Sequence, residues 1–113
     1  MKPGEIYIAR FPFGDVPGMK LRPVLLLTSS IGSVPEVLAA YISSVTPTQL
    51  LPPDFLLDPG KPEFAATHLK VLSVLRLHKL ATIHTSSIVR YLGILDTPLR
   101  EVLSTKLRQL LGL

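Results

Sequence analysis

Arg22 lies at the start of the most apolar run of this 113-residue chain, directly after a segment rich in Gly and Pro. A guanidinium at such a position can hold a phosphate through two parallel hydrogen bonds. The same position also suits an ordinary surface arginine at the edge of a strand. Arg22 is therefore a candidate anion-binding residue, and its place in the sequence leaves both interpretations open.

Ser43 and Ser44 form a second candidate group, at the end of a predicted strand and the start of a Pro-rich loop. A hydroxyl there can donate to a phosphate oxygen or relay a proton, and it can equally satisfy the backbone of its own turn. Lys20 and Lys79 add positive charge, and each is also typical of a solvated surface lysine.

The three histidines of the chain do not form a metal-binding motif. His68, His78 and His84 lack an H-x-x-x-H spacing, and the chain has no Cys. The absence of Cys excludes a disulfide scaffold, a thiolate zinc site and a cysteine nucleophile. We therefore expect no metal and no cofactor, and each histidine remains either a general base or an ordinary core or surface residue.

The composition favours a globular domain with a covered apolar surface. Twelve Lys and Arg against eight Asp and Glu give a net charge of +4, which suits a polyanionic partner. Hydrophobic residues make up 47% of the chain, which excludes disorder and indicates that a second subunit or a partner covers part of the surface. No signal peptide or transmembrane run is visible, which predicts a cytoplasmic protein without membrane contact.

Eleven Pro and seven Gly divide the chain into short apolar runs that predict strands. The run at 23–28 is almost continuously apolar and predicts a central strand covered on both faces, with Pro23 at its first position. The strands are expected at residues 5–13, 23–28, 36–44, 54–57, 71–77 with 80–83 as one long bent strand, and 88–92. Loops are expected at residues 13–20, 29–35 and 46–53.

The C-terminal segment changes to a helical period. Its apolar residues from Leu99 onward recur at i, i+3 and i+4 and indicate a helix over residues 97–111. Thr97 is the expected N-cap, Pro98 the first helical residue and Gly112 the residue after the helix. One domain over residues 1–113 is predicted, a small, mostly antiparallel barrel or sheet covered by a helix.

Several motifs occur in an order that resembles the MazF/PemK toxin family. GEIYIARFP at 4–12 and KLRPVLLL at 20–27 are similar to its G-[DE]-I strand with an F-P ending, its mobile loop and its R-P-hydrophobic strand. AYISS at 40–44 is similar to its hydrophobic-I-T-S segment. LATI, SIVRYLG and LLGL, later in the chain, resemble its L-x-T-[IL] strand, its I-x-x-x-[LI]-G element and the end of its helix.

The resemblance implies an SH3-like, partly open barrel with a C-terminal helix, which forms a homodimer and is held inactive by a cognate antitoxin. It also implies a metal-independent endoribonuclease that cuts single-stranded RNA and leaves a cyclic phosphate and a 5′-hydroxyl. The catalytic Arg of the family corresponds to Arg22 and its catalytic Thr to Ser43. The RNA-binding residues implied here are Lys20, Ser44, Thr46 and Lys79.

Three departures from the family pattern accompany the resemblance. Ser43 replaces Thr, which keeps the hydroxyl but loses the methyl group that restricts χ1. His78 and Lys79 stand where better-known toxins carry an acidic residue and Gln, and Leu72 stands where many relatives have Pro. Two hypotheses follow: an endoribonuclease toxin, or a non-catalytic small-barrel module that binds RNA or a protein partner.

Overall fold

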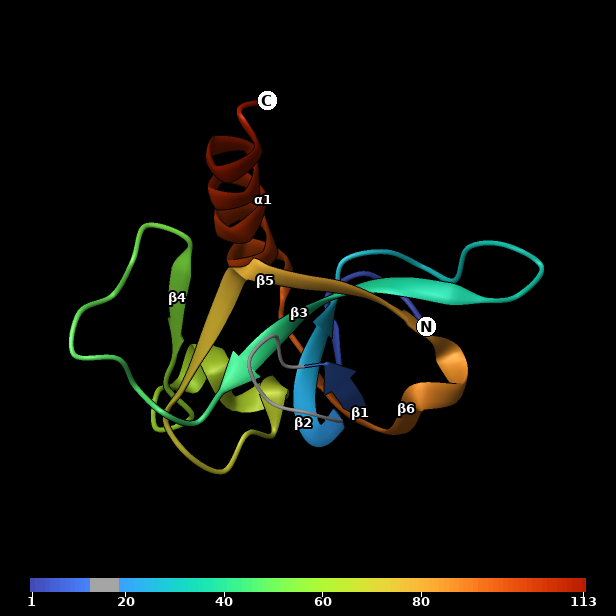
Figure 1. Cartoon of the computed structure of the whole chain (residues 1–113). Helices are drawn as coiled ribbons and strands as arrows, with labels where there is room; N and C mark the ends of the chain where they lie inside the picture. The colour runs from blue at the N-terminus through green and yellow to red at the C-terminus, as the bar shows by residue number, and fades with distance from the viewer. Residues whose placement is uncertain (13–18) are drawn as a thin grey trace.

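The apolar runs form six strands of one antiparallel sheet in the computed structural model, which describes residues 1–12 and 19–113 (Figure 1). The spatial order of the strands is β4-β5-β3-β2-β1-β6, and the sheet of the described residues is not closed. The strands are β1 (Glu5–Pro12), β2 (Met19–Leu26), β3 (Glu36–Ser43), β4 (Asp54–Leu57), β5 (Ser73–His84) and β6 (Ile88–Ile94). The predicted mainly β, partly open architecture with one C-terminal helix is confirmed.

Strand β2 begins earlier than the sequence indicated. Residues 19 and 20, assigned to the loop, belong to β2, while residues 13–18 of the predicted loop lie outside the described residues. Pro23 was expected to open the strand because it lacks an N–H. It pairs with Ile8 of β1, and the pairing of β2 with β3 begins only at Val24. The proline therefore sits inside β2 at a point where its missing N–H interrupts no bond to β3.

Strand β5 is one long strand with an irregularity in its middle, as predicted. Ala40 of β3 pairs with Leu80, but the next residue, Tyr41, pairs with Arg76. Residues 77–79 consequently have no partner on β3, and such an insertion bends a strand. The bend of β5 is visible in Figure 1, and it places His78 and Lys79 at the point where the strand changes direction.

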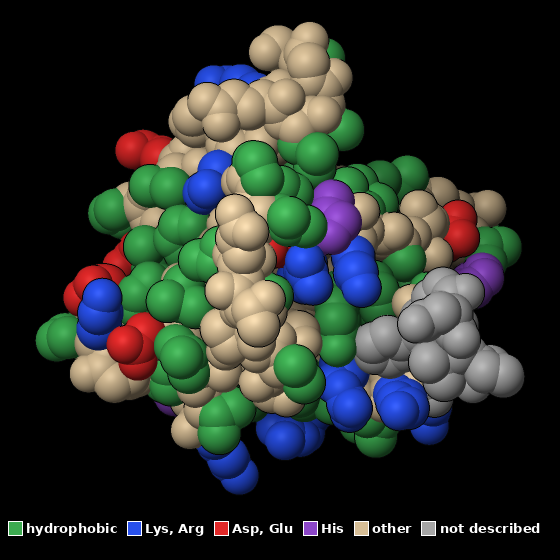
Figure 2. Space-filling model, turned by 60° about the vertical axis from the view of Figure 1, so that its left-hand side comes forward, with side chains coloured by type: hydrophobic (Ala, Val, Ile, Leu, Met, Phe, Trp, Pro, Cys, Tyr) green, Lys and Arg blue, Asp and Glu red, His purple; other side chains and the backbone are tan. Residues whose placement is uncertain are grey.

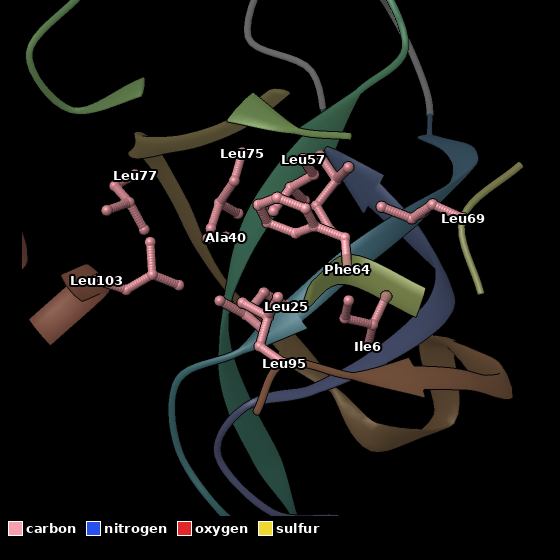
Figure 3. Close-up of a cluster of buried hydrophobic side chains, with 11 residues drawn as sticks. Ile6, Leu25, Ala40, Leu57, Phe64, Leu69, Leu75, Leu77, Leu95 and Leu103 are labelled. Atoms are coloured by element: carbon pink, nitrogen blue, oxygen red, sulfur yellow. The ribbon is translucent and has the colours of Figure 1, made fainter. Parts of the chain in front are cut away.

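The central strands bury both of their faces, which confirms the expectation for the run at 23–28. Leu25 belongs to one hydrophobic cluster, whereas its neighbours Val24 and Leu26 belong to another. Figure 3 shows the first cluster, in which Phe64 and Leu69 lie with residues of the sheet and with Leu103 of the helix. The second cluster consists of Ala9, Phe11, Val24, Leu26, Val37, Ala39, Tyr41 and Ile83.

Helix α1 (Thr97–Leu111) has the predicted bounds but a different N-cap. Asp96, not Thr97, caps it, because the Asp96 carboxylate accepts a hydrogen bond from the N–H of Leu99 at 3.2 Å. Gly112 ends the helix in the left-handed region at φ 71°, as predicted. Leu103 is its one buried residue, and the helix projects away from the sheet (Figure 1). No helix in the described part of the chain is long and apolar enough to span a membrane.

Two short 3₁₀ helices were not predicted. Helix η1 (Pro62–Thr67) precedes β5, and helix η2 (Thr85–Ser87) joins β5 to β6. Gly93 of β6 lies directly against η1, where an added Cβ would collide with the backbone carbonyl oxygens of Ala66 and Thr67. The absence of a side chain at Gly93 therefore permits the close approach of β6 and η1.

Candidate functional site

Arg22 is a half-buried residue of β2, and its neighbours in the sheet set its position. It pairs with Ala9 of β1, and its Nη1 donates a hydrogen bond to the carbonyl oxygen of Leu21 at 2.8 Å. The β2–β3 register aligns Val24 with Tyr41. Continued by two residues, that register brings Arg22 opposite Ser43. The two strands thus carry the guanidinium and the hydroxyl to the same end of the pair.

Ser43 is buried, with 7% of its surface exposed, and its hydroxyl is engaged locally. Its Oγ accepts a hydrogen bond from the N–H of Val45 at 3.1 Å and donates to the carbonyl oxygen of Val45 at 3.3 Å. The Ser43 hydroxyl thus forms hydrogen bonds with the backbone of the turn that follows it, which is the second interpretation that the sequence left open. The next residue, Ser44, is exposed.

A cationic surface backed by buried aromatic rings lies beside the bend of β5. Lys79 Nζ lies 5.9 Å from the centroid of the Tyr41 ring, which itself stacks on Phe11 at 5.5 Å with an interplanar angle of 22°. Figure 2 shows Lys and Arg side chains and a His side chain gathered around hydrophobic side chains on this face. Tyr41 and Phe11 are both buried, so the rings support the cation from below, and the exposed Lys79 is the group that a phosphate can reach.

A buried carboxylate underlies this surface. The Asp54 side chain is inaccessible to solvent and accepts hydrogen bonds from Arg76 Nε at 2.9 Å, from Arg76 Nη2 at 3.3 Å and from the Leu51 N–H at 2.9 Å. His78 Nδ1 lies 4.0 Å from Asp54 Oδ1. Burial lowers the pKa of His78, the charges of Arg76 and Lys79 lower it further, and Asp54 opposes them. The imidazole is therefore biased towards its neutral form.

A pocket of about 230 Å³ opens among β1, β2, β3, β6 and the segment that precedes β5. Of the six predicted site residues, Arg22 and Ser44 line it, and Ser43, Lys20, Thr46 and Lys79 do not. Thr46 and Lys20 are exposed. The lining residues are Ile8, Arg22, Pro23, Ile42, Ser44, His68, Leu69, Lys70, Val71, Ser73, Arg90 and Leu92.

Sequence reasoning missed several of these polar residues. Lys70 and Ser73 lie in no motif, and Arg90 takes an unspecified position of SIVRYLG. The three residues converge only through the pairing of β6 with β1 and the path of the chain into β5. His68 was considered but not placed in the site. Among the described residues, no group of three His, Asp or Glu side chains is arranged to hold a metal ion.

The family follows from the sequence match and agrees with this fold. Residues 2–111 match the model of the PemK-like, MazF-like toxins of type II toxin-antitoxin systems. The chain therefore belongs to this toxin family. No curated protein sequence gives a significant match.

Solved structures of similar fold include several mycobacterial proteins. Mycobacterium tuberculosis toxin MazF-mt6 superposes with a TM-score of 0.73 at 23% identity over 96% of this chain and 97% of that one. An endoribonuclease in complex with its cognate antitoxin, from a mycobacterial species, gives 0.68 at 18% identity over 100% and 96%. A mycobacterial endoribonuclease gives 0.69 at 15% identity over 100% and 92%.

Proposed function

We propose that this chain is a sequence-specific endoribonuclease toxin that cleaves single-stranded RNA without a metal and leaves a cyclic phosphate and a 5′-hydroxyl. The observation that carries the proposal is the match of residues 2–111 to the toxin family. The β2–β3 register supports it: the pairing ends at Val24 and Tyr41, and its continuation by two residues aligns Arg22 with Ser43, a cation and a hydroxyl from two neighbouring strands.

The chemistry requires three things of the protein. The ribose 2′-oxygen must lose its proton and attack the adjacent phosphorus, the five-coordinate intermediate must be stabilised, and the departing 5′-oxygen must gain a proton. The Arg22 guanidinium supplies positive charge where the equatorial oxygens become more negative. Ser43 donates a hydrogen bond to one of these oxygens or relays the proton. Since the 2′-hydroxyl is the nucleophile, DNA is not cut.

Substrate binding is assigned to the surface around the bend of β5. Lys79 is held over the Tyr41 ring, where its exposed ammonium can meet a phosphate of the RNA backbone. We place Lys20, Ser44 and Thr46 along the path of the RNA backbone on either side of Arg22. Their exposed positions leave them accessible to such a ligand.

We further propose that the toxin works in the cytoplasm as a homodimer and that a cognate antitoxin holds it inactive. A similar fold has been solved as an endoribonuclease with its antitoxin. The support in this chain is the exposure of apolar residues along α1 and just beyond it, namely Val102, Leu110, Leu111 and Leu113. A second copy of the chain or the antitoxin would bury it.

A second candidate function is a non-catalytic RNA- or protein-binding module. The observation that favours it is the Ser43 hydroxyl, which is engaged with the backbone of Val45 rather than available to a substrate. Incubation of the purified chain with a long single-stranded RNA in EDTA, followed by mapping of new 5′ ends, separates the two. Discrete new ends bearing a 5′-hydroxyl support the enzyme, and uncut RNA that stays bound supports the module.

A further inference from the structure

The pocket beside Arg22 has a chemical character that neither Arg22 nor Ser43 explains. Its walls include six apolar residues, namely Ile8, Pro23, Ile42, Leu69, Val71 and Leu92, and three cationic ones, Arg22, Lys70 and Arg90. No Asp or Glu is among the described residues that line it. An apolar cavity with positive charge and no negative charge selects a ligand that is both partly apolar and anionic.

His68 is held in this pocket in an unusual backbone conformation. It follows η1 with φ 55° and ψ 21°, the left-handed region, and it is the one non-glycine residue with positive φ in the described part of the chain. A side chain in this region costs about 1 kcal/mol or more. The position would suit Gly, so the conformation does not itself require an imidazole.

A hydrogen bond orients the His68 ring. Its Nδ1 lies 2.8 Å from the carbonyl oxygen of Leu92. Because a carbonyl oxygen only accepts, Nδ1 carries the hydrogen and Nε2 is left for a ligand. Gly93, the next residue, packs against the carbonyl groups of Ala66 and Thr67. The chain on both sides of this hydrogen bond is thus fixed, which presents the ring at a constant place beside the pocket.

We propose that this pocket binds one nucleotide of the RNA. The base lies against the apolar wall and the His68 ring, and the phosphate lies beside Lys70 and Arg90. The proposal rests on the proposed function, because Arg22 belongs to both the pocket and the reaction centre. It adds the place of a nucleotide next to the cleaved bond. The pocket volume of about 230 Å³ is below the ~300–1,000 Å³ of pockets for drug-sized ligands. The pocket therefore has room for a single nucleotide and not for a longer stretch of RNA.

A nucleotide fits these observations better than an acidic peptide does. Single-stranded RNA is recognised by stacking of bases on rings such as His and on guanidinium planes, with hydrogen bonds to base edges. His68, Arg22 and Arg90 offer such planes, and Ser44 and the His68 Nε2 offer polar groups to an edge. A carboxylate side chain would use the cations but would leave the apolar wall and the ring without a partner.

The test is the binding of free nucleoside monophosphates to the intact chain, followed by NMR titration. We expect one of the four to perturb the methyl signals of Ile8, Ile42 and Leu92 and to bind more tightly than inorganic phosphate. Lys70→Ala and Arg90→Ala should each weaken that binding about tenfold, as expected for loss of a charge-assisted contact. Lys61→Ala, which removes an exposed lysine outside the pocket, should leave it unchanged.

His68→Gly is the decisive variant because glycine accepts the left-handed backbone. The fold should be retained, and binding of the preferred monophosphate should weaken about tenfold. Unchanged binding in His68→Gly, equal binding of inorganic phosphate, or displacement by an acidic peptide but not by a nucleotide would each overturn the proposal. The titration does not depend on RNA cleavage. A chain that binds the nucleotide but does not cut RNA would therefore contradict the proposed enzyme and still support the nucleotide pocket.

Discussion

Arg76 and Asp54 form a two-point ion pair across the pairing of β4 with β5, with Nε to Oδ1 at 2.9 Å and Nη2 to Oδ2 at 3.3 Å. The carboxylate is fully buried, whereas the Arg76 side chain keeps 18% of its surface exposed. Asp54 also accepts the N–H of Leu51. One carboxylate thus joins the loop before β4 to the strand that carries His78 and Lys79.

Asp54→Asn is expected to lower the free energy of unfolding by about 2–4 kcal/mol. Loss of one member of a buried pair typically costs about 3–5 kcal/mol, and the partial exposure of Arg76 reduces that cost because water can reach the guanidinium. Urea denaturation measures the change. Asp58→Asn is the control, since the Asp58 carboxylate accepts an exposed turn hydrogen bond from the N–H of Gly60 at 2.9 Å. An equal loss in both variants would contradict this role for Asp54.

Arg22→Ala is expected to abolish RNA cleavage while the melting temperature stays nearly unchanged. The lost stabilisation of the transition state is on the order of 3–4 kcal/mol, or about two to three decades in rate. Arg22→Lys should restore little activity, because an ammonium lacks the two-point geometry. Cleavage is measured as the initial rate on a single-stranded RNA in EDTA. Arg108→Ala, on the exposed side of α1, is the control and should cleave normally.

Substitutions at Ser43 separate chemistry from folding. Ser43→Ala should reduce cleavage sharply and cost about 1 kcal/mol of stability through the lost bonds to Val45. Ser43→Thr should maintain or raise the cleavage rate, because the added methyl group restricts χ1. The enzyme hypothesis fails for the native chain if Ser43→Thr cleaves RNA while the native protein cleaves none in EDTA.

His78 is expected to contribute to the loss of stability in acid. Its pKa is lowered in the folded state by burial, so the unfolded chain, with a pKa near ~6.5, binds the proton more readily. The contribution of His78 to the free energy of unfolding is therefore fully present above about pH 6.5, and it is lost as the pH falls from there to the pKa of the folded state. His78→Gln should show a smaller decrease in unfolding free energy between pH 7.5 and 5.5, as measured by urea denaturation at both values. His84→Gln controls for replacement of a histidine, and an equal reduction there would reject the assignment.

Gly93→Ala should destabilise the fold, because its methyl group meets backbone oxygens of η1 rather than flexible side chains. The expected cost is about 1–3 kcal/mol. The displacement should also change the NMR signals of the His68 ring, which bonds the carbonyl of the preceding residue. Gly112→Ala is a useful comparison, since no atom of the described residues lies within 4 Å of its added Cβ, although its left-handed backbone adds a cost of its own. A Gly93→Ala protein with unchanged His68 signals would contradict the coupling.

The sequence predicted the elements whose signals are local. Helix α1 has an uninterrupted apolar period and a terminal glycine, and its bounds agree with the structure. Its N-cap was misplaced by one residue because Asp96 and Thr97 both carry a capping oxygen, and only the backbone geometry decides between them. Helix η1 was missed because six residues are too few to display a period.

The site was harder to predict because its residues meet through register. Asp54 and Arg76 are 22 positions apart and become partners only when β4 pairs with β5. The same applies to Arg90, which reaches the pocket through its pairing with Ile8. The type of Arg22 and its place beside an apolar strand made it a candidate, and only the resemblance to the toxin family gave it a catalytic role. The roles of Arg22 and Ser43 in cleavage remain predictions.

The projection of helix α1 has a consequence for the local stability of the chain. Leu103 is its one buried residue, and the partly buried Leu107 is the last residue that packs against the hydrophobic core, so the final turn depends mainly on the hydrogen bonds of the helix itself. An isolated helix of this length is marginal in water. The amide hydrogens after Leu107 should therefore exchange through fraying long before those of β2 and β3 exchange through global unfolding. Any partner that covers Leu110 and Leu111 would slow this exchange, so the end of α1 acts as a built-in reporter of assembly.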